Sequence, residues 1–306
     1  MGSDSEMNYS LSEIALLSEE ELISKSQAME RAYQIQNKPR PKEVKGVPTW
    51  LDIHGESRYC LHYSSKKRKN GPVFIDIHGG GFVWGSPEED DLFSARLNKL
   101  LDIEVYSLEY PRTAVHPFPE ALDQLYDTIK FMAYHSGDFN FNPMFMAVGG
   151  HSAGGNLAAA ITLKNNKHKD FNVKCQILAY PCVDFDINKI SDEEIAKDGL
   201  GLNREIMAFF NRVYVPRTKR KDEFCQPILA TVEEMKGLPP AVLLTCGNDI
   251  LRFQGRAYGA KLMEAYVPVL AREFDGCAHA FEVFQGEHMQ EGQDFLINGI
   301  KFWLGL

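Results

Sequence analysis

A serine held between small residues joins a strand-like run to a helix-prone run, and this junction most limits how the chain can fold. Ser152 lies in the run G-H-S-A-G at positions 150–154, after apolar residues 145–148 and before the alanine-rich residues 156–160. A sharp turn from strand to helix strains the serine backbone and brings neighbouring backbone very close, so glycines are needed around it. The pattern predicts a nucleophile elbow that presents a serine hydroxyl at the end of a strand.

Strand-like and helix-like runs alternate through most of the 306 residues. This alternation is typical of a mostly parallel sheet that is covered by helices on both faces. Ser18 and Glu21 have the spacing of a capping box at the start of the first helix. The segment from Asn37 to Pro48 contains three prolines and is expected to be a linker. Strands are expected at residues 58–63, 73–77, 103–108, 145–148, 175–180, 241–245 and 269–274, and helices at 18–36, 119–134, 153–163 and 293–304.

One region interrupts the alternation of strands and helices. Residues 185–230 contain no strand-like run, and apolar residues recur at helical spacing after Asn203, a favourable N-cap residue. We expect a helical insertion there, which with the first helix would cap the carboxyl ends of the strands, where ligands bind in such folds. The expected organisation is an N-terminal helical cap segment and linker at residues 1–48, followed by a main domain at 49–306 with its cap insertion at about 185–230.

A second glycine-rich run follows the strand expected at residues 73–77. His78 precedes three glycines, which is the pattern of an oxyanion loop in lipases and esterases. Acyl transfer passes through an oxyanion, and glycines allow several backbone N–H groups to point at it. We expect the donors to be the N–H groups of Gly80, Gly81 and Ala153, assisted by the positive end of the following helix. The alternative is a simple glycine turn, and His78 is expected to be structural because it precedes the donors.

A serine nucleophile needs a base, and the base needs an acid that orients it. In an elbow of this type the chain order is serine, then aspartate or glutamate, then histidine. Asp249 and His279 each follow a late strand-like run in that order, so they are the expected orienting acid and base. Asp249 is also placed to cap a helix, a role that it can combine with the first. Asp184 and Asp186 are competing acids, but they follow the wrong strand.

Taken together, these motifs resemble the hormone-sensitive-lipase-like esterases of the α/β-hydrolase superfamily, from about residue 45 to the end of the chain. The resemblance also rests on Y-P-R at 110–112, H-P-F-P-E-A at 116–121, D-I-L-R at 249–252 and H-A-F at 279–281. It implies an α/β-hydrolase fold, with an eight-stranded, mostly parallel sheet, helices on both faces and a helical cap. The chain departs from the family at His151, where Asp or Thr is common, at Phe253 and at residues 113–115.

The resemblance implies hydrolysis of short-chain acyl esters through an acyl-enzyme, with Ser152 as nucleophile, His279 as base and Asp249 as orienting acid. It implies no cofactor, and the expected partner is a small-molecule ester. Two alternatives stay open. One is a non-catalytic small-ligand receptor on the same fold, as in the plant gibberellin receptors, although those have lost the histidine that this chain keeps. The other is amide or formamide hydrolysis by the same triad.

Bulky residues near the expected cap and oxyanion loop are candidates for the wall of a short acyl pocket: Phe82, Trp84, Met207, Phe209 and Phe210. The alternative for Phe209 and Phe210 is that they only pack the cap onto the sheet. Members of the family that this chain resembles often pair through the edge strand, so a homodimer through residues 269–274 is expected.

Composition argues against several other classes of protein. The formal net charge is −9 and the basic residues are dispersed, so no nucleic-acid partner is expected. The sequence has neither a run of about 18 apolar residues nor a signal-peptide pattern, so no membrane partner is expected. Six cysteines lie mostly in apolar runs without a C-x-x-C pair, a usage typical of a reduced, cytoplasmic protein. No metal-ligand cluster is visible, and no metal is expected.

Overall fold

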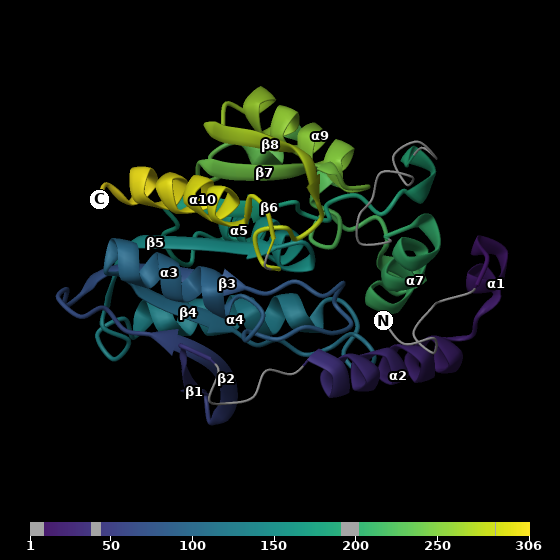
Figure 1. Ribbon diagram of the computed structural model, residues 1–306, viewed down its shortest axis with the longest axis horizontal. Coiled ribbons are helices and arrows are strands. Elements are labelled where there is room, and N and C mark those ends of the chain that lie inside the picture. Colours follow the sequence, from purple (N-terminus) through teal and green to yellow (C-terminus); the bar gives the residue numbers. More distant parts are fainter. Residues whose placement is uncertain (1–8, 38–43, 191–201, 285) are drawn as a thin grey trace.

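The apolar runs form the strands of an eight-stranded sheet in the computed structural model, which describes residues 9–37, 44–190, 202–284 and 286–306 (Figure 1). The strand order is β1-β2-β4-β3-β5-β6-β7-β8. β2 pairs antiparallel with both β1 and β4, and the remaining neighbours are parallel, so the predicted mostly parallel sheet is confirmed. The strands are β1 Val47–Ile53, β2 Glu56–Tyr63, β3 Gly71–Ile77, β4 Glu104–Leu108, β5 Phe141–His151, β6 Cys175–Ala179, β7 Ala241–Asn248 and β8 Val269–Ala278.

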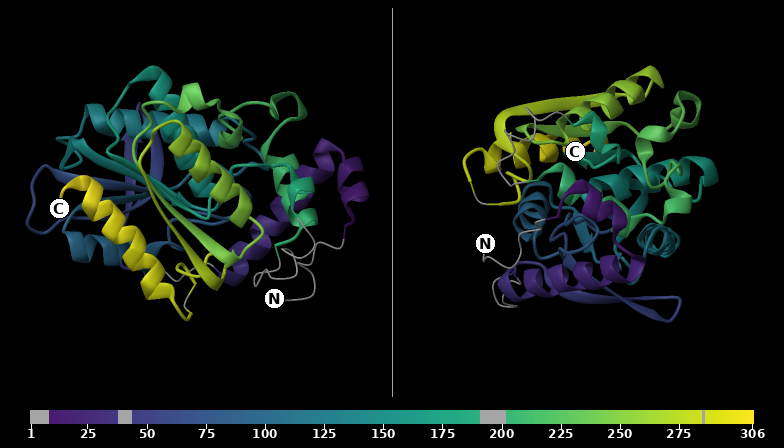
Figure 2. Two further views of the ribbon diagram at one scale, coloured as in Figure 1. Left: turned by 90° about the horizontal axis from the view of Figure 1, so that it is seen from above. Right: turned by 90° about the vertical axis from the view of Figure 1, so that its right-hand side faces the viewer.

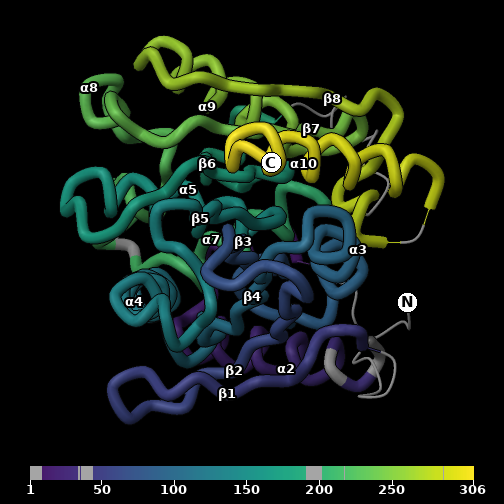
Figure 3. The backbone as a smooth tube through the Cα atoms, turned by 90° about the vertical axis from the view of Figure 1, so that its left-hand side faces the viewer, coloured from purple at the N-terminus to yellow at the C-terminus, as the bar shows by residue number. Residues whose placement is uncertain are grey.

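Helices cover both faces of this sheet (Figure 3). Successive strand residues point to opposite faces, so Phe74 packs with α3 and α10 on one side, while Ile75 packs with α4, α5 and α9 on the other. The helices are α1 Leu11–Leu16, α2 Glu19–Asn37, α3 Asp91–Leu101, α4 Glu120–Tyr134, α5 Ala153–His168, α7 Arg204–Tyr214, α8 Val232–Met235, α9 Arg252–Glu264 and α10 Met289–Leu304, with single 3₁₀ turns at Ile187–Lys189, Arg217–Lys219 and Pro227–Leu229. None of the helices in the described part of the chain has the length and apolarity needed to cross a membrane.

β1 and α3 are among the elements that were not predicted from the sequence. β1 begins at Val47, so the expected linker runs two residues into the sheet, and residues 38–43 lie outside the described residues. β1 is an edge strand in which only Leu51 and Ile53 are buried, and its edge position tolerates Pro48. Such a strand has a weak apolar signal. α3 was also missed, although Phe93, Leu97 and Leu101 recur at helical spacing and are buried.

The N-terminal helices and α7 form a group at the end of the sheet toward which β5 points (Figures 1 and 2). Asn203 caps α7 as predicted, because its side chain accepts a hydrogen bond from the N–H of Ile206 at 2.8 Å. The Arg212 side chain of α7 donates to the backbone carbonyls of Ile14 and Leu17. An apolar cluster binds the three helices together: Ile14, Leu22, Val83, Phe209, Phe210 and Val213.

Candidate active site

β5 ends and α5 begins on either side of Ser152, as expected for a nucleophile elbow. The Ser152 backbone has φ 55° and ψ −112°, which is a strained combination for a residue other than glycine. Its N–H donates to the carbonyl oxygen of Ala179 on β6 at 2.9 Å. A Cβ atom on Gly154 would overlap the carbonyl oxygen of Ile77 on β3, and one on Gly150 would overlap the same oxygen. Gly150 and Gly154 therefore allow the backbone of the elbow to pack directly against β3.

The three residues predicted as a triad are brought together by this elbow and by the ends of β7 and β8. His279 Nε2 lies 2.9 Å from Ser152 Oγ, and His279 Nδ1 lies 2.8 Å from Asp249 Oδ2. Asp249 and His279 are 2% and 7% exposed, whereas Ser152 is partly exposed. A carboxylate can only accept, so Nδ1 carries a proton and the Nε2 lone pair is available to the serine hydroxyl.

Asp249 is not the N-cap residue of α9 that the sequence suggested, because Leu251 occupies that position and makes no side-chain capping bond. Asp249 Oδ1 accepts a hydrogen bond from the N–H of Leu251 at 2.8 Å, in the turn before α9. The two oxygens of one buried carboxylate thus serve the turn and the histidine separately, which fixes the carboxylate orientation. The competing acid Asp184 is engaged elsewhere, because its Oδ2 pairs with Lys189 at 2.6 Å.

The glycine loop after β3 lies directly beside the serine. A Cβ atom on Gly79 would be 3.6 Å from Ser152 Cβ. Gly80 and Gly81 have φ values of 109° and 59°, which favour glycine, and the carbonyl of Gly80 accepts from two following N–H groups. Ala153 is the first residue of α5, where N–H groups have no partner within the helix. The three expected oxyanion donors therefore come from two segments that flank Ser152.

His78 holds this loop and is fully buried, in accord with its expected structural role. Its Nδ1 lies 2.7 Å from the carbonyl oxygen of Gly79, and its Nε2 lies 3.1 Å from Glu109 Oε1. The ring stacks on Tyr110 with 4.3 Å between centroids. Arg112 Nη2 adds an ion pair to the same Glu109 oxygen at 2.7 Å. Glu109 is therefore the acid that joins the oxyanion loop to the Y-P-R motif.

The stability of the protein is expected to depend on pH through the Glu109 carboxylate, which contacts His78 and Arg112. Burial alone would raise the pKa of its carboxyl group, but the hydrogen bond from His78 and the charge of Arg112 lower the pKa to about 2. A pKa below the unfolded value of about 4.3 stabilises the fold above that pH, and the stabilisation is lost as the pH falls toward 2. We expect Glu109→Gln to flatten the fall in unfolding free energy between about pH 4.3 and 2, measured by denaturant titration. Glu120→Gln, at an exposed site, is the control; equal acid slopes in wild type and Glu109→Gln would contradict the prediction.

The five residues predicted to wall an acyl pocket take different places. Phe82 stacks on Tyr214 with 3.7 Å between ring centroids and is 1% exposed, so it packs in the core. Met207 is buried in a small cluster with Cys182, Ile250 and Leu251, next to the turn that carries Asp249. Met207 is thus a residue of α7 itself, whereas Phe82 packs against the last residue of that helix from the glycine loop.

The other three lie together between the oxyanion loop and the N-terminal helices. Phe210 packs over Gly81, since a Cβ atom on that glycine would lie 2.7 Å from the phenyl ring. Trp84 contacts Phe210 edge-on and stacks on Tyr33 of α2. Phe209 is completely buried within the apolar cluster that joins α7 to α1 and α2. Of the five, Phe210 is therefore the side chain in direct contact with an expected oxyanion-loop glycine.

A buried ionic cluster lies under the elbow, and the sequence patterns did not reveal it. His151 Nδ1 lies 3.0 Å from Glu282 Oε1, which also accepts a hydrogen bond from Tyr180. Asp76 and Asp90 lie near the same imidazole. Burial alone would lower the pKa of His151, but Asp90, Asp76 and Glu282 together raise it well above its usual range. The only hint of this cluster in the sequence was His151 itself, where the family that the chain resembles commonly has Asp or Thr.

Comparisons with known proteins identify relatives over most of the chain. Residues 74–283 match the model of a family described as the α/β hydrolase fold. An arylesterase of Saccharolobus solfataricus is 31% identical over 72% of this chain and 71% of its own length. LipN of Mycobacterium tuberculosis, a carboxylic ester hydrolase, is 30% identical over 78% of this chain and 65% of its own. The solved structure of EstE1, a thermostable carboxylesterase cloned from a metagenomic library, superposes with a TM-score of 0.78 at 28% identity, covering 95% of this chain and 99% of that one.

Proposed function

Because the chain belongs to the hormone-sensitive-lipase-like esterases of the α/β-hydrolase fold and is a carboxylic ester hydrolase, we propose which residues carry the reaction. Ser152, His279 and Asp249 hydrolyse short-chain acyl esters through an acyl-enzyme. The single observation that carries the proposal is the continuous set of contacts from Ser152 Oγ through His279 to Asp249 Oδ2, at 2.9 and 2.8 Å. Each group has the neighbour that its role requires.

The first half-reaction transfers the acyl group to the enzyme. Ser152 Oγ attacks the ester carbonyl carbon while His279 Nε2 takes the hydroxyl proton. The carbonyl π electrons move to oxygen, and the resulting oxyanion is held by the N–H groups of Gly80, Gly81 and Ala153. When the tetrahedral intermediate collapses, the bond to the alkoxy oxygen breaks and His279 gives its proton to the departing alcohol. The Asp249 carboxylate stabilises the imidazolium between the two proton transfers.

The second half-reaction repeats the same steps with water. His279 Nε2 removes a proton from water as its oxygen attacks the acyl carbon, and the oxyanion forms at the same three N–H groups. Collapse then breaks the bond to Ser152 Oγ, which recovers the proton from His279. The products are a carboxylic acid and a free enzyme, so the cycle needs only the ester and water.

A panel of p-nitrophenyl esters of graded acyl length, assayed with wild type and Ser152→Ala, tests this function. Turnover that disappears in Ser152→Ala supports the proposal. A wild type that binds but does not turn over any ester of the panel would favour the receptor alternative. The matching p-nitroanilides and formamides, run in parallel, separate ester from amide hydrolysis, because the triad alone does not set the leaving-group preference.

We propose that Phe210 limits the acyl length, and two neighbouring phenylalanines allow a matched test. Phe210 packs over Gly81, whereas Phe209 is buried among helices α1, α2 and α7. We expect Phe210→Ala to shift the optimum toward longer acyl groups, because it removes bulk beside the oxyanion loop. Phe209→Ala should lower the unfolding free energy by about 3–5 kcal/mol and leave the acyl profile unchanged. Identical profiles in wild type and Phe210→Ala, or a wild-type optimum at a long fatty acyl chain, would contradict this.

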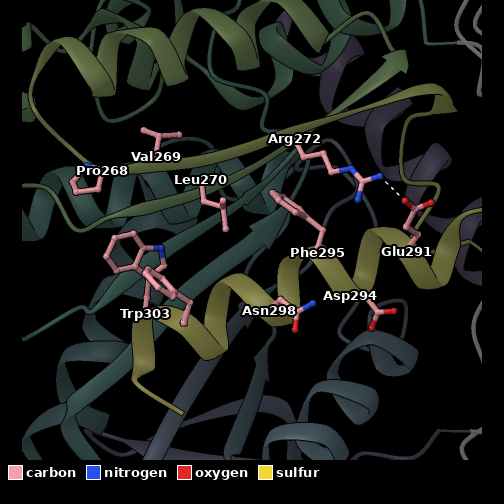
Figure 4. Close-up of a pocket in the computed structure, with 10 residues that line it drawn as sticks. Pro268, Val269, Leu270, Arg272, Glu291, Asp294, Phe295, Asn298 and Trp303 are labelled. Atoms are coloured by element: carbon pink, nitrogen blue, oxygen red, sulfur yellow. Dashed lines mark hydrogen bonds and ion pairs between the residues drawn. The ribbon is translucent and has the colours of Figure 1, made fainter.

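We further propose a cytoplasmic homodimer. All six cysteines are buried and unpaired, which supports a reducing compartment. β8 lies at one edge of the sheet, and apolar side chains line the groove between it and α10, among them Leu270, Phe295 and Trp303 (Figure 4). An open strand edge beside apolar surface favours pairing with a second copy. Light scattering of the purified chain is expected to give the mass of a dimer, and Leu270→Lys that of a monomer; a monomeric wild type would refute the interface.

A further inference from the structure

We propose that Asp76, Asp90 and His151 bind a divalent transition-metal ion beneath the nucleophile elbow. Asp76 lies near the end of β3, two residues before His78, and His151 ends β5 immediately before Ser152. Asp90 is the residue that precedes α3. One ligand atom from each of the three side chains lies within 4.8 Å of the other two. The site is structural and stands apart from the proposed ester hydrolysis.

The hydrogen bonds of His151 present one ring nitrogen to this site. Glu282 Oε1 lies 3.0 Å from Nδ1, and because a carboxylate only accepts, Nδ1 donates to it. The other nitrogen, Nε2, faces Asp76 Oδ1 at 3.6 Å, which is too long for a hydrogen bond. Metal-bound histidines typically donate their second ring N–H to a carboxylate in this way. Glu282 therefore has the position of the acid that orients a metal-binding imidazole.

The two aspartates offer oxygens that lack protein partners. Asp76 Oδ2 accepts from Ser107 at 2.7 Å and from Ser94 at 3.3 Å, and these bonds fix the direction of Oδ1. Neither Asp76 Oδ1 nor Asp90 Oδ2 has a hydrogen-bond partner among the described residues, although the two side chains are 0% and 2% exposed. Asp90 stands at the N-cap position of α3 yet makes no capping bond. Buried carboxylate oxygens without partners are costly, and burial raises the pKa of Asp90 well above its usual range. A bound cation would relieve this cost and keep both carboxylates ionised.

A metal ion satisfies this arrangement better than a proton on His151. A proton on Nε2 would serve one oxygen, whereas two carboxylate oxygens lack partners. Zn²⁺ binds imidazole nitrogen and carboxylate oxygen at about 2.0–2.2 Å, so two ligand atoms at a tetrahedral angle lie about 3.4 Å apart. The 3.6 Å between His151 Nε2 and Asp76 Oδ1 is close to that value. Mg²⁺ prefers oxygen ligands only and suits the site less well. The ion would join β3, β5 and the start of α3 under the serine.

The wild-type chain without an affinity tag provides the decisive experiment. It is stripped with a chelator, titrated with Zn²⁺, desalted and analysed by plasma mass spectrometry, with Mn²⁺ and Mg²⁺ as parallel probes. We expect about one equivalent of Zn²⁺ per chain to remain bound and the melting temperature to rise, because binding to the folded state stabilises it. The proposal would be overturned if neither Zn²⁺ nor Mn²⁺ bound saturably and neither ion raised the melting temperature. His151 would then be a buried imidazolium.

Variants then locate the ion. Asp90→Asn should lose retained Zn²⁺, and Glu282→Gln should weaken binding by about 10- to 100-fold, the usual effect of removing an acid that orients a metal-bound histidine. His116→Gln is the matched control, because it removes an exposed histidine that pairs with Glu120 and could hold metal adventitiously. Zn²⁺ that stays bound in Asp90→Asn but is lost in His116→Gln would overturn the assignment.

Discussion

Replacing Ser152 with alanine should lower the rate of ester hydrolysis by about 10⁴-fold or more, and His279→Ala should have an effect of similar size. The reason is that His279 Nε2 and Ser152 Oγ, 2.9 Å apart, form one proton-transfer unit. Removing either member removes the activated nucleophile. The double variant should therefore be little slower than either single one, and kcat measured on a short-chain p-nitrophenyl ester tests this.

Two further variants separate the triad from its surroundings. Asp249→Asn keeps an oxygen for the Leu251 N–H but no longer holds the His279 ring with its proton on Nδ1, so we expect a loss of about 10⁴-fold in kcat with the fold retained. His135→Ala, at an exposed histidine beyond α4, is the control and should be fully active. Near-normal turnover in His279→Ala would show that another residue is the base.

The second large effect is expected at Gly154, where a single added methyl group meets backbone. A Cβ atom there would overlap the Ile77 carbonyl and lie 2.5 Å from that of His78, so the elbow must move away from β3. Displacing a nucleophile by about 1 Å can cost about 100-fold in rate, and forced overpacking costs about 1–3 kcal/mol of stability. We expect both losses in Gly154→Ala, measured as kcat/KM and as the free energy of unfolding.

Gly137 provides the matched control for this substitution. A Cβ atom there would have no atom within 4 Å, and the Gly137 backbone does not have positive φ. Gly137→Ala should leave kcat/KM unchanged and raise the unfolding free energy by up to about 1 kcal/mol, because it restricts the unfolded chain. Gly154→Ala with the activity and stability of wild type would mean that the elbow is not confined by β3.

The sequence predicted those parts of the fold and site that depend on a short local motif, such as a cap, a glycine turn or a polar residue at the end of a strand. Ser152, Asp249 and His279 each follow an apolar run, and parallel strands bring their carboxyl ends to one edge, so local patterns and chain order sufficed to predict their proximity. The Asn203 cap and the Ser18–Glu21 capping box are likewise local, and both are present.

Features that depend on distant partners were beyond sequence patterns. The buried contact of His151 with Glu282 joins residues 131 positions apart, and no spacing rule connects them. Phe82 follows an oxyanion-loop glycine and was expected near substrate, yet its ring stacks on Tyr214 of α7 in the core. β1 was missed because most of its side chains are not buried, so its sequence contains no continuous apolar run.

The contact of Arg212 with the carbonyls of Ile14 and Leu17 has a consequence for how the protein is made. Chains leave the ribosome from the N-terminus, so α1 and α2 emerge long before α7, the helix that they pack against. Until then the apolar face containing Ile14 and Leu22 has nothing to cover it, and chaperones can bind it during synthesis. α1 and α2 are thus translated before α7 but dock late, and they complete the wall beside the oxyanion loop only after most of the sheet has been synthesised.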